Sequence, residues 1–568
     1  MKYILGLNSG GYNTAAVLLQ DGVPLFAVEE ERLIRQKQTR YFPKNAIAAC
    51  LEHAGIQMED VEAVVINWNP AINIEALNVP QTLRMRYMGE IFYAIPSNLM
   101  ALRADNASST SEQRIRFLDE SELNVQYINH HQTHAAAYFC SPFDEAAVLT
   151  MDAFGERHST SFARGIGNKL DIFYSLDFPQ SVGSFYSVYT EYLGFRSSSE
   201  EWKLMGASSY GDPDRFYAKI RSTVTLRDDG GYGLDLSLYD HHQFQRSAFF
   251  TEDLVKLLGV EPHSGSGPLS KDYYDIAAGA QKVTEEIIFH LANHLHRQTG
   301  MKNLVVSGGV AMNCVVNGKI LANTPFENIF ISPVPDDSGG ALGGALYYYH
   351  HVLGHPRKYR MTDNYLGPGY ASEEIKATLE KYKINYETVT DPAQKAAELI
   401  AGGSIIGWFQ GRLEYGDRAL GNRSILADPR DASMKDKVNA TIKYREKFRP
   451  FAPSVMEEHF QDYFVDALPT PYMEKVFQIP PKWHKHIPAV THADGSGRLQ
   501  TVSKEQNSDY WNLINAFNTL TGVPIVLNTS FNLKGEPVVC SPTDAIRTFF
   551  SSGLDALVMG RYIVLKNR

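Results

Sequence analysis

Two histidines and an aspartate in one short stretch of the chain have the types and spacing of a metal site. His130 and His134 lie four residues apart in the run NHHQTHAAAYF, so on a helix both imidazoles lie on one face and can reach one ion. The following run, AAVLTMDAFGE, predicts a buried strand over 146–150, and Asp152 comes where that strand gives way to a loop. His131 points off this face, and we do not expect it to be a ligand. Imidazole and carboxylate without thiolate favour iron, manganese or zinc over a structural zinc site.

Two glycine-bearing turns later in the chain add groups that can hold a phosphate. The run LVVSGGVAMNCVVNGKI predicts a strand, a turn at Gly308 and Gly309, and a helix, and backbone N–H groups of such a turn can accept a phosphate or a ribose. The run IFISPVPDDSGGALGGALYYY repeats this arrangement, with Asp336 and Asp337 directly before a helix of small residues. An acid at that place can complete a metal site, and small residues over 339–345 allow the helix to pack closely.

A basic region follows in the last third of the chain. Within forty residues the sequence places a cluster of basic side chains among Gly, Asn and Pro, which includes Arg412, Arg418, Arg423, Arg430, Lys443, Arg445 and Arg449. They do not form a helical stripe, so a solvated basic face explains them poorly, and arginines suit bidentate capture of phosphates or carboxylates. Arg498 lies in a similar turn context. At the end of the predicted strand VPIVLNTS, Asn528 and Ser530 can orient a small polar substrate.

Composition narrows the class of protein. The chain has 568 residues, enough for two or more domains, with 44% hydrophobic and 21% charged residues, as in ordinary globular enzymes. The net charge of −10 argues against nucleic acid or an anionic membrane as the main partner. Four isolated cysteines without a CxxC pair fit a reducing compartment. With an N-terminal apolar run too short for a signal peptide and no membrane span, we expect a cytoplasmic protein.

The order of predicted elements indicates an α/β fold with a duplicated first part. Strands over 3–7 and 15–19 flank the turn NSGGYNT, and VPLFAVEEE follows as a further strand after an Asp-Gly turn. This arrangement fits either a phosphate-wrapping hairpin of an actin-type nucleotide-binding fold or a plain structural hairpin. The strands that begin at 146 repeat the order of residues 3–30, which suggests a structural duplication. Residues 76–120 look like an insertion.

Taken together, these motifs make the sequence resemble the O-carbamoyltransferase family, which includes the nodulation-factor and tobramycin carbamoyltransferases. The resemblance spans essentially the whole chain and rests on long, specific runs: the HHxxHAA text, TMDAFGE, EWKLMG, SGGVAMNCVVNGKI, GRLEYGDRALGNRSILADPR, IKYREKFRPFAPS, HADGSGRLQTV and NTSFNLKGEPVV. It implies an N-terminal actin-like (Kae1-like) metal- and nucleotide-binding domain over 1–350, a connection over 351–390, and a C-terminal α/β domain over 391–568 like the YrdC-type, carbamoyl-adenylate-forming proteins.

The resemblance also implies a division of labour between two sites. In the C-terminal site, carbamoyl phosphate and ATP would give carbamoyl adenylate; the residues implied there are Arg418, Lys443, Arg449, Arg498, Asn528 and Ser530. In the N-terminal site, Fe(II) or another divalent metal would anchor the phosphate of the adenylate; its implied ligands are His130, His134, Asp152 and Asp337. The nucleotide would be held there by Lys203, Gly308, Gly309 and Asn313. By itself, Lys203 is better explained as a surface lysine at a helix end. A substrate hydroxyl would then attack, releasing AMP.

One departure from the family concerns activation of the acceptor hydroxyl. Where the family often has His-Asp in the first turn, this chain has Tyr12 and Asn13, and a tyrosine is a poor general base at neutral pH. We therefore expect the base elsewhere, at His131, at Asp152 or on the substrate itself. The residues predicted to be catalytic are His130, Asp152 and Tyr12. We expect a small-molecule acceptor with a hydroxyl, such as a sugar or natural product, and allow a homo-oligomer. The alternatives are an actin-fold small-molecule kinase or ATPase and a non-catalytic, metal-stabilised nucleotide sensor.

Overall fold

The computed structural model describes residues 2–9, 11, 13–68, 110–243, 246–443, 446 and 448–566, and these form two compact units. Unit 1 comprises Met1–Ala27 and Arg40–Met361, and unit 2 comprises Val28–Thr39 and Thr362–Arg568. Tyr12, Arg445 and residues 76–109 of the expected insertion lie outside the described residues. Among the residues that are described, no helix has both the length and the apolar character needed to cross a bilayer.

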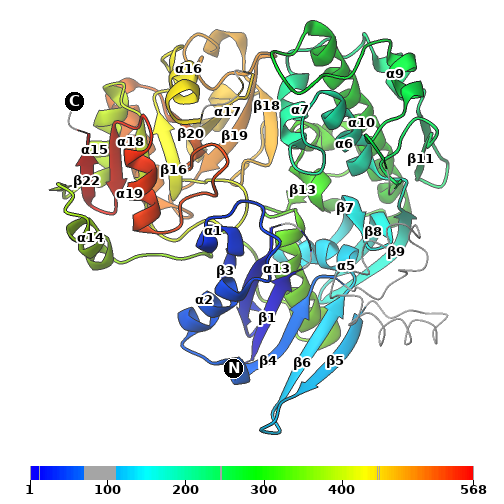
Figure 1. Ribbon diagram of the computed structural model, residues 1–568, viewed down its shortest axis with the longest axis horizontal. Helices are drawn as coiled ribbons and strands as arrows, with labels where there is room; N and C mark the ends of the chain where they lie inside the picture. The colour runs from blue at the N-terminus through cyan, green and yellow to red at the C-terminus, as the bar shows by residue number, and fades with distance from the viewer. Residues whose placement is uncertain are drawn as a thin grey trace. The chain divides into compact units, whose positions relative to one another are not determined.

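The first sheet of unit 1 has six strands in the order β3-β2-β1-β4-β6-β5 (Figure 1). Its strands are β1 (Tyr3–Asn8), β2 (Ala15–Gln20), β3 (Val23–Glu29), β4 (Val61–Ile66), β5 (Thr110–Arg116) and β6 (Glu122–Ile128). β1 and β2 pair antiparallel, whereas β1 and β4, and then β4 and β6, pair parallel. Strand β1 is apolar and buried throughout its interior, as expected for a central strand covered on both faces.

The second sheet of unit 1 repeats this pattern in five strands, β13-β12-β7-β8-β9. Its strands are β7 (Glu145–Gly155), β8 (His158–Ile166), β9 (Lys169–Asp177), β12 (Asn303–Ser307) and β13 (Asn328–Ile331). An antiparallel meander β7-β8-β9 comes first, and β12 and β13 then add in parallel. The same strand order in two sheets confirms the predicted duplication and the actin-like α/β architecture of the first part of the chain.

Helix α13 (Asp337–Tyr347) packs closely because glycines remove side chains from its contact face. A Cβ on Gly343 would come within 1.9 Å of the carbonyl oxygen of Thr133 in α5 (His130–Ala135), and one on Gly340 within 2.4 Å of Asn67 Nδ2. The close packing expected from the small residues is therefore confirmed. The other helices of unit 1 are α2 (Lys44–Ala54), α6 (Val182–Tyr192), α7 (Glu201–Ser208), α8 (Tyr217–Arg221), α9 (Glu252–Leu258), α10 (Lys271–Thr299), α11 (Cys314–Asn317) and α12 (Ile320–Asn323).

Unit 2 is built on a mixed sheet in the order β14-β22-β21-β15-β16-β20-β17-β19-β18. The strands are β14 (Glu387–Thr388), β15 (Ile406–Phe409), β16 (Arg423–Ala427), β17 (Ala452–Met456), β18 (Lys475–Gln478), β19 (Ser496–Val502), β20 (Ile525–Ser530), β21 (Ala556–Met559) and β22 (Tyr562–Leu565). Alternate residues of β20 enter different core clusters, Val526 in one and Ile525 and Leu527 in the other. Both faces of the sheet are therefore covered.

The helices of unit 2 include one from the N-terminal part of the chain. They are α1 (Glu30–Ile34), α14 (Ser372–Lys381), α15 (Pro392–Ala401), α16 (Met434–Val438), α17 (Phe460–Tyr463), α18 (Ser508–Thr521) and α19 (Pro542–Phe550). Residues 351–361 of the expected connection group with unit 1, and the rest of it, with helix α14, groups with unit 2. The segment Val28–Thr39, which carries α1, also belongs to unit 2.

Candidate active site and metal centre

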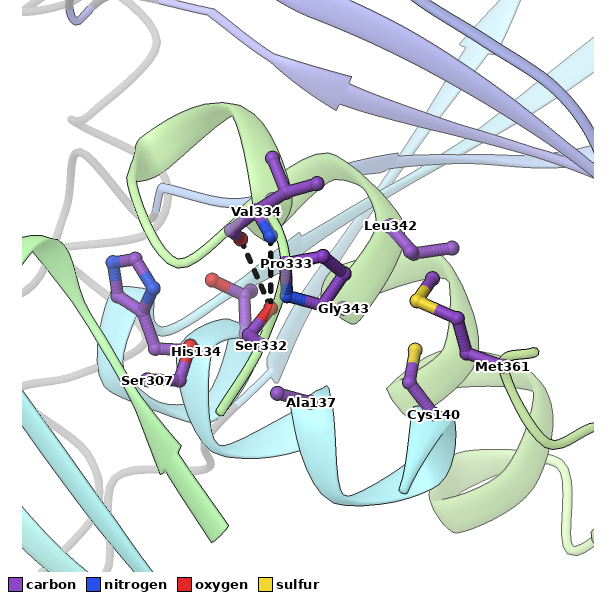
Figure 2. A pocket seen from close by; sticks show the side chains of 12 residues that line it. His134, Ala137, Cys140, Ser307, Ser332, Pro333, Val334, Leu342, Gly343 and Met361 are labelled. Carbon is purple, nitrogen blue, oxygen red and sulfur yellow. Dashed lines mark hydrogen bonds between the residues drawn. The ribbon is translucent and has the colours of Figure 1, made fainter. Parts of the chain in front are cut away.

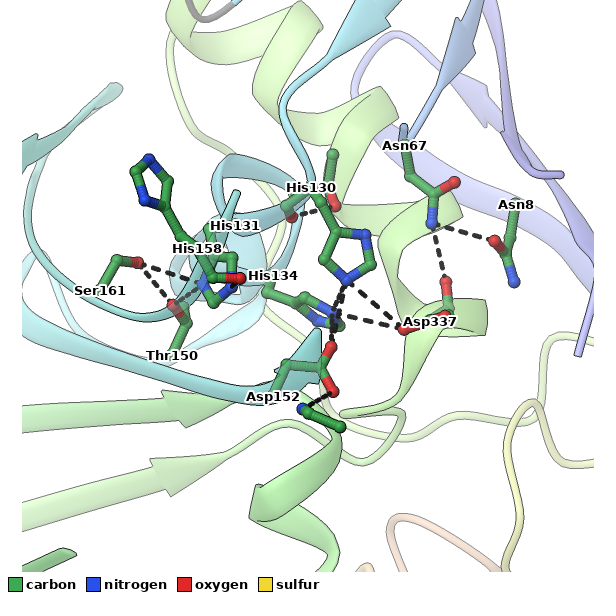
Figure 3. Close-up of polar contacts among 12 residues, drawn as sticks. Asn8, Asn67, His130, His131, His134, Thr150, Asp152, His158, Ser161 and Asp337 are labelled. Carbon is green, nitrogen blue, oxygen red and sulfur yellow. Dashed lines mark hydrogen bonds and ion pairs between the residues drawn. The ribbon is translucent and has the colours of Figure 1, made fainter. Parts of the chain in front are cut away.

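Four side chains of unit 1 bring one ligand atom each to a common point, as Figure 3 shows. The Nε2 atoms of His130 and His134 are 2.9 Å apart, and each lies 3.1 Å from Asp152 Oδ2. Asp337 Oδ1 lies 3.5 Å from His130 Nε2 and 3.7 Å from His134 Nε2. All four ligand atoms fall within 4.8 Å of one another. The structure thus brings together the two histidines and two acids that the sequence singled out.

Three elements position these ligands. Helix α5 presents both imidazoles on one face, as the four-residue spacing requires. Strand β7 ends beyond Asp152, whose backbone carbonyl accepts a hydrogen bond from Ser181 Oγ and whose Oδ1 accepts one from the N–H of Ala153. Asp337 is the first residue of α13. The site is buried: His130 and His134 are 0% and 2% exposed, and Asp152 is 8% exposed.

The electrostatics of this cluster suit a bound cation. Burial opposes a charge on His134, but hydrogen bonds to Asp152 and Asp337, together with their negative charges, raise the pKa of His134 to about 10. Burial alone would raise the pKa of Asp152, but the two histidines outweigh it and hold that pKa well below its usual range. The two carboxylates therefore demand positive charge at this point. Two imidazole nitrogens and two carboxylate oxygens are a donor set that fits Fe, Mn or Zn.

His131 faces away from the ligand atoms, as expected from its position on the helix. Its Nδ1 lies 2.7 Å from Thr150 Oγ1, and its Nε2 lies 3.0 Å from the carbonyl oxygen of His158. A ring nitrogen facing a carbonyl must be the protonated one, so Nδ1 accepts the threonine hydroxyl. Burial, followed by the neighbouring histidines, lowers the pKa of His131 well below its ordinary value. Both nitrogens are occupied by the protein, so His131 is a poor source of a general base.

A chain of buried amides, which the sequence motifs did not reveal, supports Asp337. Asn67 Nδ2 donates to the carbonyl oxygen of Asp337 at 3.0 Å and to Asn8 Oδ1 at 3.2 Å (Figure 3). Asn8 in turn donates to the carbonyl oxygen of Asn13, and Asn13 Nδ2 donates to Asp336 Oδ2 at 2.8 Å. Asn8 and Asn67 each come at the end of a parallel strand, β1 and β4, and this shared position was the available signal.

A pocket borders His134. His134, Ala137 and Cys140 line it from one side, and Ser307 and Met361 also border it (Figure 2). Its wall is shaped by the loop 332–334, where Ser332 Oγ donates to the carbonyl oxygen of Val334 and accepts from its N–H. The pocket mixes hydroxyl, sulfur and methyl groups, so it offers little charge to a ligand.

The glycine turn of β12 contacts the same cluster. Gly308 has φ = +91°, and a Cβ there would lie 2.2 Å from the carbonyl oxygen of Met151. A Cβ on Gly309 would lie 2.9 Å from Asp152 Oδ1. Glycine at these two positions is therefore what allows the turn to approach the ligand aspartate.

The other residues expected to hold a nucleotide in unit 1 have protein partners. Asn313 exchanges hydrogen bonds with Gln281 of α10 at 2.9 and 3.2 Å and caps α11 through the N–H of Val316. Lys203 of α7 pairs with Glu200 at 2.6 Å and lies 5.1 Å from the centre of the Phe195 ring. A sulfur contact between Met205 and Cys314 connects α7 to α11. Asn313 is thus bound to α10, and Lys203 lies on α7. Nucleotide binding by these two residues stays a prediction.

The second group of candidate residues lies on the central strands of unit 2. The buried Lys443 ammonium donates to Ser530 O at 2.6 Å, to Asn532 Oδ1 at 2.7 Å and to Asn532 O at 3.0 Å. These partners are neutral. Asn528 lies two residues before Ser530 on β20, on the same face of the strand. Lys443, Asn528 and Ser530 are therefore neighbours around the end of one strand.

Hydrogen bonds and strand register connect this group to the arginines. Asn528 Nδ2 donates to the carbonyl oxygen of Ala419, the residue after Arg418, and to Gln500 Oε1 at 3.0 Å. Arg498 lies two residues before Gln500 on β19, on the same face of that strand. Arg449 precedes β17, which pairs with both β19 and β20. The predicted anion-binding residues of unit 2 thus gather around β17, β19 and β20.

Family models now account for both units. A model described as Carbamoyltransferase N-terminus matches residues 3–346, and one described as Carbamoyltransferase C-terminus matches residues 397–566. The chain belongs to the carbamoyltransferase family. It is accordingly an enzyme that transfers carbamoyl groups, and the family resemblance expected from the motifs is confirmed.

Two curated relatives and one solved structure are similar to this chain. The carbamoyltransferase is 37% identical over 572 residues to nodulation protein NolNO of Sinorhizobium fredii, covering 98% of this chain and 80% of that protein. It is 40% identical over 449 residues to nodulation protein NolO of Bradyrhizobium diazoefficiens, covering 77% and 79%. Among solved structures, HypF of T. kodakarensis is similar at 15% identity and a TM-score of 0.31, covering 62% of this chain and 48% of that one.

Not every arginine of the basic region is available to a substrate of the carbamoyltransferase. Arg412 donates to the carbonyl oxygens of Gly367 and Leu366, and the fully buried Arg423 donates to those of Gln410, Asn422, Pro368 and Gly411. Arg430 pairs with Asp428. These three arginines therefore hold the fold together, so the basic character of 412–449 overstated the number of anion ligands.

Proposed function

We propose that this carbamoyltransferase is an ATP-dependent O-carbamoyltransferase that acts through carbamoyl adenylate. The observation that carries the proposal is the convergence of His130, His134, Asp152 and Asp337 on one point. A divalent cation there suits a phosphate-bearing carbamoyl donor better than a free carbamate. The cationic residues of unit 2 would bind the anionic reactants while they are activated.

The activation step in unit 2 is proposed to proceed as follows. Carbamoyl phosphate and water give carbamate and inorganic phosphate, and a carbamate oxygen attacks the α-phosphorus of ATP. The bond from that phosphorus to the bridging oxygen breaks, leaving carbamoyl adenylate and pyrophosphate. Arg418, Arg449 and Arg498 would bind the phosphates, because guanidinium groups match their oxygen geometry. Asn528 and Ser530 would hold the carbamoyl group, with Lys443 fixing Ser530 through the contacts described above.

In unit 1 the proposed metal ligands are His130, His134, Asp152 and Asp337. Fe(II) or another divalent ion held there would neutralise charge on the phosphate of the adenylate, which makes AMP a better leaving group. Gly308 and Gly309 bring a turn with backbone N–H groups beside Asp152, and Lys203 and Asn313 are proposed to contact the nucleotide.

The acceptor is proposed to be a small molecule with a hydroxyl group, as in a sugar or a natural product. Its oxygen attacks the carbamoyl carbon, the bond to the AMP oxygen breaks, and the hydroxyl proton leaves. His130 and Asp152 are committed to the ligand cluster, and His131 has both ring nitrogens occupied. Because a tyrosine such as Tyr12 is a poor general base at neutral pH, the base is proposed to be a group of the substrate itself.

The first test is to incubate the protein with ATP, carbamoyl phosphate and Fe(II) under anaerobic conditions and to measure pyrophosphate, AMP and ADP. We expect pyrophosphate and inorganic phosphate in equal amounts, and only when carbamoyl phosphate is present. Hydroxylated acceptors that raise AMP release would identify the acceptor class. ADP formed without any need for carbamoyl phosphate would instead support the kinase or ATPase alternative and overturn the proposal.

Matched variants separate the two half-reactions. Lys443→Met should lower pyrophosphate formation about 100-fold, whereas His134→Ala should leave it largely intact and abolish transfer to the acceptor. If each variant removes both half-reactions equally, the proposed division of labour between the units is wrong.

A further inference from the structure

The loop that carries Arg418 is buried except at its tip. From Leu413 to Asn422 all residues are buried apart from Asp417, which is exposed, and Arg418, which is partly exposed. In the described part of the chain, the Arg418 guanidinium has no hydrogen-bond or ion-pair partner. A loop with this distribution holds two charged side chains at the surface of a rigid frame.

The part of the loop that follows Arg418 is fixed by Glu414 of the same loop and by two side chains of the sheet. Glu414 Oε1 accepts hydrogen bonds from the N–H groups of Leu420 and Asn422 at 2.7 and 2.8 Å. The carbonyl oxygen of Leu420 accepts from Gln500 Nε2 at 3.0 Å, and that of Ala419 accepts from Asn528 Nδ2 at 3.1 Å. Everything that follows Arg418 in this loop is thus anchored.

The part of the loop that precedes Arg418 is fixed by a segment from the N-terminal part of the chain. The N–H of Gly416 donates to Glu29 Oε1 at 2.8 Å, and its carbonyl oxygen accepts from the Arg32 guanidinium at 3.0 Å. Glu29 and Arg32 also contact each other at 3.4 Å, and each is about 3% exposed. Gly416 has φ = +112°, a conformation that only glycine adopts readily, so both of its backbone groups are held in an otherwise unusual turn.

Further contacts hold the segment around Arg32 and the residue before Gly416. Arg32 is also held by Glu31 at 3.2 Å, and Glu31 Oε2 accepts from the N–H of Gln38 at 2.6 Å, which closes the segment on itself. In Tyr415, the residue before Gly416, the N–H donates to the carbonyl oxygen of Asn364 and the carbonyl oxygen accepts from Asn364 Nδ2, both at 2.9 Å. Four consecutive backbone groups directly before the tip are therefore all satisfied by partners outside the loop.

We propose that the buried pair Glu29–Arg32 positions Arg418. The pair fixes both backbone groups of Gly416, and this holds the Arg418 guanidinium toward the anionic reactant of unit 2. This inference rests on the proposed activation of carbamoyl phosphate and ATP. Glu29 and Arg32 touch no substrate; they act through Gly416. Binding by an arginine depends on geometry, because its two parallel N–H groups must face two oxygens at once.

The test is a double-variant cycle on the full-length protein. Removing Arg32 alone would leave two buried carboxylates, those of Glu29 and Glu31, uncompensated and could unfold the protein. Arg32→Met is therefore combined with Glu29→Gln and Glu31→Gln, and this combined change is the pair replacement. We expect the KM for carbamoyl phosphate or ATP to rise about tenfold, with kcat less affected. In an Arg418→Met background the same pair replacement should change KM less than about twofold. Arg547→Met, which removes an exposed arginine that pairs with Glu536 in the same unit, is the control and should leave KM unchanged.

Hydrogen exchange of the peptide 412–422 provides a readout that does not depend on activity. The pair replacement should speed exchange at Gly416, and Glu29→Gln alone, which keeps an acceptor oxygen for that N–H, should speed it less. Unchanged exchange, or a KM effect of equal size with and without Arg418, would overturn the positioning role. If the unmodified protein makes no pyrophosphate from ATP and carbamoyl phosphate, the proposed function itself is wrong, and the role of the pair in it falls as well.

Discussion

The two units carry candidate sites of opposite charge and opposite construction. In unit 1, two carboxylates and two imidazoles converge with their ligand atoms within 4.8 Å. In unit 2, a buried lysine faces neutral oxygens of Ser530 and Asn532, and arginines lie on the neighbouring strands. The first arrangement requires a cation and the second attracts anions.

The sites also differ in how the fold builds them. The site of unit 1 draws on α5, β7 and α13, elements far apart in sequence, and glycines at 308, 309, 340 and 343 allow their backbones to approach. The site of unit 2 gathers on neighbouring strands of one sheet, whose register sets the spacing of Asn528, Ser530 and Arg498. Unit 1 thus depends on close helix packing, whereas unit 2 depends on strand order.

The largest effect should come from removing a ligand of unit 1. His134→Ala deletes one of four converging donors, and we expect the affinity for Fe(II) or Mn(II) to fall more than ~100-fold, with loss of carbamoyl transfer. Anaerobic titration calorimetry measures this directly. His290→Gln, which changes a histidine of α10 that contacts the carbonyl oxygen of Arg227, is the control and should bind metal normally. Normal metal affinity in His134→Ala would refute the cluster as the metal site.

The corresponding change in unit 2 is Lys443→Met. It removes the ammonium that orders Ser530 and Asn532, and we expect pyrophosphate formation to fall about 100-fold, with metal affinity unchanged. Lys475→Met, at another buried lysine of unit 2 that pairs with Glu474, should retain most of the activity. A loss of metal binding in Lys443→Met would erase the contrast between the two sites.

A smaller effect should follow from the amides that support the ligands of unit 1. Asn67→Ala removes the donor to the carbonyl oxygen of Asp337, and partners of this kind typically change metal affinity by about tenfold. Asn124→Ala, at a β6 amide that donates to Tyr348, should bind metal with unchanged affinity. Equal losses in the two variants would show that Asn67 acts on general stability and not on the ligand.

Local spacing made much of this architecture predictable from the sequence. The His130–His134 spacing and the buried strand that carries Asp152 depend only on helix and strand periodicity, although β7 continues to Gly155 and not only to the predicted loop at Asp152. The repeated strand order was visible because each half begins with a hairpin and continues with strands in parallel. The role of the basic residues was less accessible: Arg412 and Arg423 bind backbone carbonyls, and nothing in their local sequence separates them from Arg418.

Contacts between distant parts of the chain escaped prediction for the same reason. Glu29 and Arg32 read as the polar end of an apolar strand, yet they belong to unit 2 and hold Gly416, nearly four hundred residues later. The amides of Asn8 and Asn67 are ordinary residues after strands until β1 and β4 pair in parallel. Sequence periodicity identifies the elements, whereas the partners of buried polar groups depend on how those elements pack.

The last prediction concerns the stability of unit 1 and a histidine that belongs to neither site. Burial lowers the pKa of His241 in unit 1 to about 4, and its Nε2 donates to the carbonyl oxygen of Pro179 at 2.9 Å. A histidine with a depressed pKa in the folded state binds its proton more readily when unfolded. Its contribution to stability is therefore complete above the unfolded pKa of about 6.5 and declines as the pH falls toward 4.

Urea unfolding at pH 7 and pH 4.5 tests this expectation in the variant His241→Gln, which keeps a hydrogen-bond donor but does not titrate. We expect the variant to lose about 2 kcal/mol less than the unmodified protein between the two pH values. The contrast with His134 is what makes the measurement informative. His134 is buried beside two carboxylates that favour its charge, whereas His241 is buried beside His242 and Arg246, which oppose it. An identical loss of stability with acid in the variant and the unmodified protein would contradict the lowered pKa of His241. The contrast between the neighbours of His241 and those of His134 would then have no effect on stability.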